Sequence, residues 1–109
     1  DQVVSVALQY TGVPYRYGGA DPSGFDCSGY VMFVYAQFGI ALPHSAAGIG
    51  ASGTPIATSD ALPGDIVIMP GHTGIYMGDG NFIDSGDYGD LIHVRPIYDS
   101  NYYIVRVGI

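Results

Sequence analysis

The sequence lacks several residue types, and their absence limits what the protein can bind. Its 109 residues include no Lys, no Glu and no Trp, so ten Asp stand against three Arg and the formal net charge is −7. Nucleic acids and anionic membrane surfaces are bound through basic patches, so this charge argues against both as partners. No run approaches the roughly 18 apolar residues of a membrane-spanning helix, so we expect no membrane insertion.

Cysteine is also scarce. The single Cys27 excludes an internal disulfide, and one thiol cannot build a cysteine-rich zinc site. The 17 Gly and 7 Pro are scattered between apolar runs, which favours many turns rather than disorder. The length suits one domain, residues 1–109, with one hydrophobic core. The main question is whether Cys27 is a small buried residue or a nucleophile.

The first half of the chain predicts helices. The strongest pattern follows Asp26, a candidate N-cap, and precedes Gly39, a typical stop signal. A first helix is predicted over Asp1–Thr11 with Asp1 as its N-cap, and a short one near Ser45–Ile49. The pattern after Asp26 repeats at i, i+3, i+4, i+7, i+8 and i+11, as on a helix packed against a core: Cys27, Tyr30, Val31, Val34, Tyr35 and Phe38.

The second half predicts strands. Helices followed by an antiparallel sheet are typical of an α+β domain. The expected strands are Asp65–Met69, His72–Met77, Asn81–Ser85, Leu91–Ile97 and Tyr102–Val107.

A cysteine nucleophile needs a stabilised thiolate, a base within hydrogen-bond reach and a group that orients the base. Cys27 lies in the first turn of its predicted helix, where backbone N–H groups and the helix dipole stabilise an anion. Of the three histidines, His72 opens a strand directly after Pro70-Gly71, where its imidazole can face a cleft. The pattern alone leaves the alternatives open, because free cysteines are often buried and each histidine is compatible with a structural role.

The turn after His72–Met77 decides whether Asp84 can orient that histidine. Side chains alternate along a strand, so a two-residue loop would place His72 and Asp84 on opposite faces. A three-residue loop, Gly78-Asp79-Gly80, would pair Gly74 with Asp84 and place His72 and Asp84 on one face. We therefore predict the three-residue loop, with Asp84 beside the imidazole.

These residues resemble the NlpC/P60 cysteine peptidases of bacterial cell walls, most closely those of the actinobacterial Rip type. Five motifs carry the resemblance in order and cover nearly the whole chain. They are Gly12-Val13-Pro14-Tyr15-Arg16-Tyr17-Gly18-Gly19, Gly24-Phe25-Asp26-Cys27-Ser28-Gly29, Leu42-Pro43-His44-Ser45, Leu62-Pro63-Gly64-Asp65-Ile66-Val67 and His72-Thr73-Gly74-Ile75-Tyr76-Met77-Gly78-Asp79-Gly80.

The resemblance implies a papain-like α+β fold, with N-terminal helices packed on an antiparallel sheet. It also implies hydrolysis of the γ-D-glutamyl–diaminopimelate bond of peptidoglycan stem peptides through a thioester. Cys27 would be the nucleophile, His72 the base and Asp84 the third residue. The substrate subsites would be lined by Tyr15, Asp26, Ser28, His44 and Ser45.

The resemblance implies further expectations about setting and partners. We expect a monomeric bacterial catalytic domain, part of a longer secreted or cell-wall-associated chain, that acts on stem peptides or muropeptides without metal or cofactor. The alternatives are a non-catalytic peptidoglycan-binding module of the same fold, or an amidase or transpeptidase with the same catalytic pair. A related acyltransferase is excluded because those enzymes carry the histidine before the cysteine.

Two features depart from the family's pattern. Asp84 stands where relatives more often carry His, and we expect its charge to raise the pKa of His72. Only Met69-Pro70-Gly71 separates the preceding strand from His72, a short connection that favours either a more open cleft or one closed by a segment outside this chain.

Overall fold

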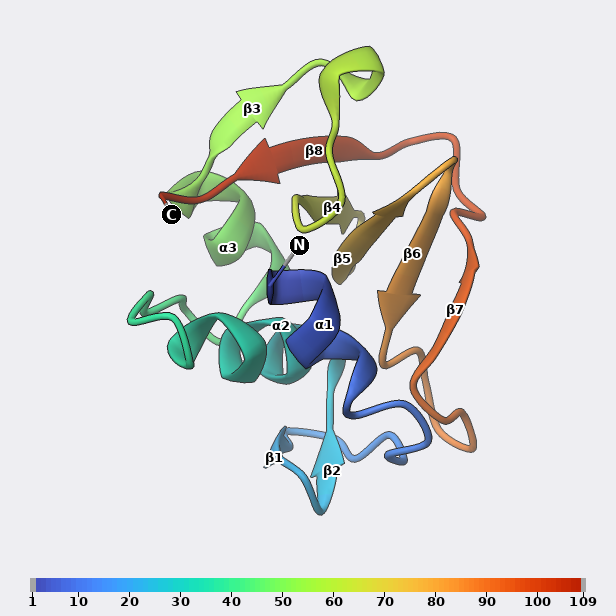
Figure 1. Ribbon diagram of the computed structural model, residues 1–109. Coiled ribbons are helices and arrows are strands. Elements are labelled where there is room, and N and C mark those ends of the chain that lie inside the picture. Colours follow the sequence, from blue (N-terminus) through green and yellow to red (C-terminus); the bar gives the residue numbers. More distant parts are fainter. Residues whose placement is uncertain (1, 109) are drawn as a thin grey trace.

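The computed structural model describes residues 2–108, and it places three helices against one large antiparallel sheet (Figure 1). The helices are α1 (Gln2–Leu8), α2 (Cys27–Ala36) and α3 (Ala46–Ser52), with a short 3₁₀ helix at Thr58–Asp60. The six-stranded sheet has the order β3-β8-β4-β5-β6-β7, and its strands are β3 (Thr54–Ile56), β4 (Ile66–Met69), β5 (His72–Gly78), β6 (Asn81–Asp84), β7 (His93–Pro96) and β8 (Tyr103–Arg106). The predicted α+β class is confirmed.

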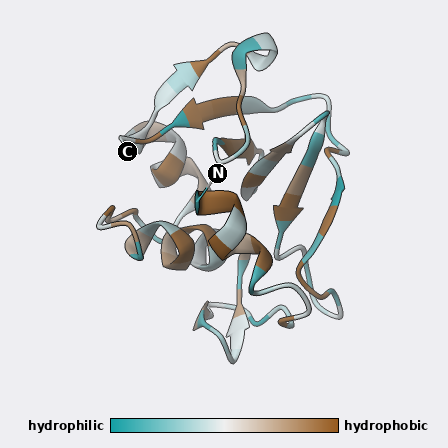
Figure 2. Ribbon diagram, in the orientation of Figure 1, coloured by the Kyte–Doolittle hydropathy of each residue, from teal (hydrophilic) through white to brown (hydrophobic). Residues whose placement is uncertain are grey.

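A small hairpin lies outside the large sheet. It consists of β1 (Ala20–Asp21) and β2 (Gly24–Phe25), and it projects beyond α2 at the bottom of Figure 1. Figure 2 shows this hairpin mostly in hydrophilic and neutral colours, whereas hydrophobic colour gathers on the helices and on the strands of the large sheet. The hairpin precedes Cys27 directly and therefore fixes how the chain enters α2.

Four of the six residues of the predicted stripe are buried, and the two at its ends, Cys27 and Phe38, are half-buried. Tyr30, Val31 and Val34 have no exposed surface, and they pack with Ile66 and Ile75 of the sheet. The Tyr30 hydroxyl donates to the Ala7 carbonyl oxygen at 2.8 Å and so joins α2 to α1. The N-terminal end of α2 is therefore held against the sheet by packing on both sides.

Element boundaries differ from the sequence prediction at a few places. The first helix ends at Leu8 rather than Thr11, and its proposed N-cap Asp1 lies outside the described residues. The predicted strands are confirmed to within two residues, but the short β1 and β2 and the edge strand β3 were not foreseen. Pro55 lies at its centre, and this strand forms one edge of the sheet, where a missing backbone N–H is tolerated.

The β5–β6 hairpin corrects one prediction and confirms another. Gly78 pairs with Asn81, so the loop is the two-residue Asp79-Gly80 and the three-residue prediction is wrong. Asp79 and Gly80 have φ values of 54° and 78°, and Asp tolerates this left-handed region better than most residues do. A bulge between Tyr76 and Gly78 then adds one residue to β5.

That bulge reverses the alternation of side chains. Tyr76 pairs with Phe82 and Ile75 with Ile83, so continuing the register places Gly74 opposite Asp84. His72 and Asp84 consequently share a face, as predicted, although by a different turn.

No helix within residues 2–108 is long and apolar enough to cross a membrane.

Gly74 gives a test of this register. A Cβ atom at position 74 would lie 2.5 Å from Phe82 Cδ2 and 2.9 Å from Asp84 Cβ. We expect Gly74→Ala to lower the free energy of unfolding by about 1–3 kcal/mol in urea denaturation, because both side chains must move. Gly108→Ala is the control: a Cβ at position 108 would have no neighbour within 4 Å among residues 2–108 and its φ is not positive, so its stability should match the wild type. Equal stability of both variants would contradict this register.

Candidate functional site

Cys27 is the first residue of α2 and lies half-buried in a cleft. Asp26 precedes it in an extended conformation, and its carboxylate accepts a hydrogen bond from the Gly29 N–H at 2.6 Å. The cleft has a volume of about 500 Å³. It is lined by Cys27, Ser28, Ser45, Ala46, Ala47, Ile68, Met69, Pro70, Gly71 and Tyr103.

His72 lies at the start of β5, where it interacts with both Cys27 and Asp84. Its Nε2 donates to Asp84 Oδ2 at 2.6 Å, which leaves Nδ1 for proton exchange with the thiol. Asp84 has no exposed surface and His72 is almost fully buried. The structure therefore brings together Cys27 of α2, His72 of β5 and Asp84 of β6.

The surroundings of His72 favour its protonated form. Burial alone would lower the pKa, because it penalises the imidazolium. The hydrogen bond to Asp84, the interaction with the Cys27 side chain and the charges of both outweigh burial, and they raise the pKa of His72 from 6.5 to about 9. The direction expected from the sequence is confirmed, and His72 carries a proton at neutral pH.

Asp84 is held ionised despite its burial. Loss of solvent would raise its pKa, but hydrogen bonds from His72 and Arg95 and their positive charges lower it below the ordinary value. Arg95 Nε donates to Oδ1 at 3.0 Å and Nη2 donates to Oδ2 at 2.5 Å. Both carboxylate oxygens are therefore bound by charged donors.

Sequence reasoning missed Arg95. The residue lies in β7, where it is paired with Phe82, diagonally opposite Asp84 on the same face. A signal was present in the sequence: one of only three arginines falls in a strand that pairs with the Asp84 strand. Its partner could not be chosen without the register between β6 and β7.

Asp26 and His44 form a second polar pair beside Cys27. His44 Nε2 lies 2.8 Å from Asp26 Oδ1 and 2.9 Å from Oδ2, and the Ser28 hydroxyl lies 3.3 Å from Oδ1. Ser45 follows in sequence and caps α3 by accepting from the Gly48 N–H at 3.1 Å. Ser28 and Ser45 thus line the cleft, and Asp26 and His44 join the site through their contacts with each other and with Ser28.

Tyr15, the fifth predicted subsite residue, approaches the site from the loop before β1. Burial raises the pKa of its phenol, and the nearby charges of Cys27 and Asp26 raise it further, so the hydroxyl remains a proton donor. Tyr88 packs edge-on against Tyr15, with ring centroids 5.2 Å apart, and was not foreseen. Tyr88 lies in the loop between β6 and β7 and is largely exposed.

The described residues contain no cluster of metal-ligating side chains. Among residues 2–108, no three His, Cys or Asp side chains are grouped as metal ligands would be. The chemical groups that the site brings together are a thiol, an imidazole and a carboxylate.

Sequence comparison gives one family and several endopeptidase relatives. Residues 12–107 match the profile of the NlpC/P60 family. The chain is 46% identical over 110 residues to the probable endopeptidase Rv2190c of Mycobacterium tuberculosis, an alignment that covers 93% of this chain and 29% of the relative. The chain thus spans less than a third of that relative's length.

Solved structures show the same fold. The NlpC/p60 domain of the peptidoglycan hydrolase SagA superposes with a TM-score of 0.88 at 34% identity, covering 97% of both chains. RipD of M. tuberculosis, described as a non-catalytic NlpC/p60 domain protein adapted to peptidoglycan binding, superposes with a TM-score of 0.85 at 28% identity, covering 98% of this chain and 95% of RipD.

The His72 titration tests the electrostatics of the site. In the wild type, imidazole resonances followed by NMR should titrate near pH 9, and in Asp84→Asn the pKa of His72 should fall because the negative partner is lost. The exposed carboxylate of Asp79 is the control, and Asp79→Asn should leave the His72 titration unchanged.

The same shift has a consequence for stability. A pKa raised on folding stabilises the protein fully below the unfolded value of 6.5, and that contribution is lost as pH rises towards about 9. A wild-type His72 that titrates at or below pH 6.5 would contradict the assigned geometry.

Proposed function

Because the chain belongs to the NlpC/P60 family, we propose that it is a cysteine peptidase that hydrolyses the γ-D-glutamyl–diaminopimelate bond of peptidoglycan stem peptides. The observation that carries this proposal is the series Cys27, His72 and Asp84, with a hydrogen bond of 2.6 Å between the last two inside a buried environment. Its substrate would be reached at the cell wall.

The first half-reaction forms a thioester. The Cys27 sulfur attacks the γ-glutamyl carbonyl carbon as a thiolate, a C–S bond forms and the carbonyl electrons move to oxygen. When the tetrahedral intermediate collapses, the C–N bond breaks and His72 Nδ1 gives its proton to the leaving amine of diaminopimelate. A His72 pKa of about 9 supports this role, because the proton is already present at neutral pH.

The second half-reaction hydrolyses the thioester and regenerates the free enzyme. Neutral His72 takes a proton from water, the resulting hydroxide attacks the thioester and the C–S bond breaks to release the glutamyl carboxylate and the thiolate. Asp84 holds the imidazole in one tautomer and stabilises its charged form through both steps. No other proton carrier is required.

The developing oxyanion would be stabilised by two donors. The first turn of α2 presents backbone N–H groups without helical partners, and Cys27 itself contributes one of them. The Tyr15 hydroxyl, kept protonated by its raised pKa, would supply the second. We assign substrate binding to Tyr15, Asp26, Ser28, His44 and Ser45.

Asp26 is the candidate for recognising a free amine. Its carboxylate lies beside Cys27 and is paired with His44, an interaction that an ammonium group can replace or share. Together with Ser28, it would bind the amine of an N-terminal L-Ala in the stem peptide.

A non-catalytic peptidoglycan-binding module is the alternative that the likeness to RipD raises. The intact Cys27–His72–Asp84 series favours catalysis, because a binding module needs no buried carboxylate behind an imidazole. An amidase-type hydrolase would use the same residues on another bond, so product masses distinguish the two.

Cys27→Ala tests the nucleophile. We expect the variant to release no fragments from defined muropeptides, measured by mass spectrometry, while retaining their binding in calorimetry, because the cleft remains and only the sulfur is lost. Ser52→Ala is the control, since its exposed hydroxyl donates to the Gly48 carbonyl oxygen within α3, away from the Cys27–His72–Asp84 series, and it should keep wild-type turnover. Undiminished cleavage by Cys27→Ala would overturn the proposal.

Asp26→Asn tests amine recognition. Asn still caps a helix but lacks the charge, so KM for a stem peptide with a free N-terminal amine should rise roughly tenfold to a hundredfold, the loss of one charge-assisted hydrogen bond. With the same peptide acetylated at its N-terminus, wild type and Asp26→Asn should have equal KM. An equal rise of KM for both peptides would show that Asp26 does not read the amine.

A further inference from the structure

Arg95 makes two charged hydrogen bonds to the buried carboxylate behind His72. Its Nε and Nη2 contact Asp84 Oδ1 and Oδ2 at 3.0 and 2.5 Å. Oδ2 is shared, because it also accepts from His72 Nε2 at 2.6 Å. Arg95 therefore touches the same oxygen as the imidazole, although it lies on a different strand.

Two aromatic rings hold the guanidinium in place. Its Cζ lies 4.6 Å from the centroid of the Tyr98 ring and 5.6 Å from that of Phe82. Tyr98 also lies 6.2 Å from the His72 ring and 6.0 Å from Phe82. One contiguous cluster thus joins the guanidinium, the carboxylate and the imidazole.

The burial of Asp84 makes this arrangement necessary. A carboxylate without solvent must be bound by donors on both oxygens, or it becomes neutral or turns to a new partner. His72 contacts only Oδ2, so Arg95 provides the contact to Oδ1. A planar fork of two N–H groups also fixes the plane of the carboxylate, which a single contact does not.

We propose that Arg95 is a positioning residue, which keeps Asp84 ionised and turns its Oδ2 towards His72 so that His72 faces Cys27. The inference rests on the proposed function, and it extends the catalytic series from three residues to four. Arg95 does not touch the reacting atoms and acts only through Asp84.

Other titratable groups lie near this cluster and influence the pKa values of its members. Cys27 and Tyr30 face it from α2, Asp90 from the loop before β7, and Tyr98 and Asp99 from the segment after β7. These groups stay the same in the variants below, except where Tyr98 is itself replaced. Changes in titration can then be assigned to Arg95.

The central comparison is Arg95→Met against Arg95→Lys. Met removes the charge and the fork, so kcat for muropeptide cleavage should fall about tenfold to a hundredfold with KM within twofold, and the Asp84 carboxyl, followed by ¹³C NMR, should titrate at a higher pH than in wild type. Lys keeps the charge without the fork, so Asp84 should titrate near the wild-type value while kcat is only partly restored.

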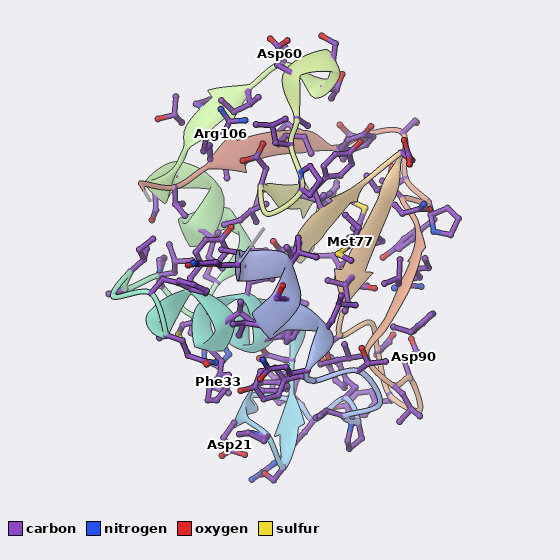
Figure 3. The ribbon with its side chains drawn as sticks, in the orientation of Figure 1. Asp21, Phe33, Asp60, Met77, Asp90 and Arg106 are labelled. Atoms are coloured by element: carbon purple, nitrogen blue, oxygen red, sulfur yellow. The ribbon has the colours of Figure 1, made fainter. Side chains whose placement is uncertain are left out.

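Arg106→Met is the matched control. Arg106 makes the same two-pronged contact, with Nε and Nη2 2.8 and 2.9 Å from the oxygens of Asp65. Figure 3 shows Arg106 on β8 near Asp60, at the opposite end of the molecule from Asp90, the neighbour of Arg95. Its loss should lower stability but leave kcat and the Asp84 titration unchanged.

Tyr98 gives a second route if Arg95→Met does not fold. Tyr98 is 60% exposed, so Tyr98→Ala should fold. Loss of the ring over the guanidinium should lower kcat at least threefold and raise the pKa of Asp84. Tyr98→Phe keeps the ring and should restore both.

The outcomes separate this inference from the proposed function. The peptidase function stands if the wild type cleaves muropeptides and Cys27→Ala does not. In that case the positioning role is still wrong if Arg95→Met and Tyr98→Ala keep both the wild-type kcat and the wild-type pKa of Asp84. If wild type cleaves no muropeptide, the proposed function fails, and the Asp84 titration alone still decides whether Arg95 keeps the carboxylate ionised.

Discussion

The site depends on one carboxylate that has no exposed surface, that of Asp84 at the end of β6. Asp84 stays ionised only because His72 and Arg95 bind its two oxygens, and each reaches it from a different strand. The position of Asp84 in turn depends on the bulge in β5, which brings it onto the face of His72. Gly74 leaves room for it, because any Cβ there would collide with Asp84. Backbone irregularity and buried charge are therefore parts of one arrangement.

The charge composition can be understood from the same kind of contact. Two of the three arginines each bind a largely buried Asp, Arg95 with Asp84 and Arg106 with Asp65. This leaves eight carboxylates against Arg16 alone, which accounts for the net charge of −7. Two of the scarce cations thus neutralise buried carboxylates, and the remaining charge of the protein is strongly acidic.

Much of the site could be predicted because its signals are local. The stripe after Asp26 placed Cys27 at a helix start, and the strand after Pro70-Gly71 placed His72 at a strand start. Arg95 and Tyr88 escaped prediction because neither belongs to a recognisable local pattern. The predicted length of the β5–β6 loop was wrong for a related reason. The prediction assumed that side chains alternate strictly along each strand, and a bulge interrupts that alternation with few signals in the sequence.

The sequence by itself determined the order of helices and strands, the cap at Asp26 and the presence of one thiol, because periodicity, capping and turn chemistry act over a few residues. Only the tertiary structure decided that Arg95 meets Asp84 and how the hairpin brings His72 and Asp84 together. Cys27, His72, Asp84 and Arg95 come from four elements spread over about two-thirds of the chain, and their contacts depend on register, packing angle and one inserted residue in β5. Contacts between distant segments depend on the strand order and register of the whole sheet, which no local stretch of residues encodes.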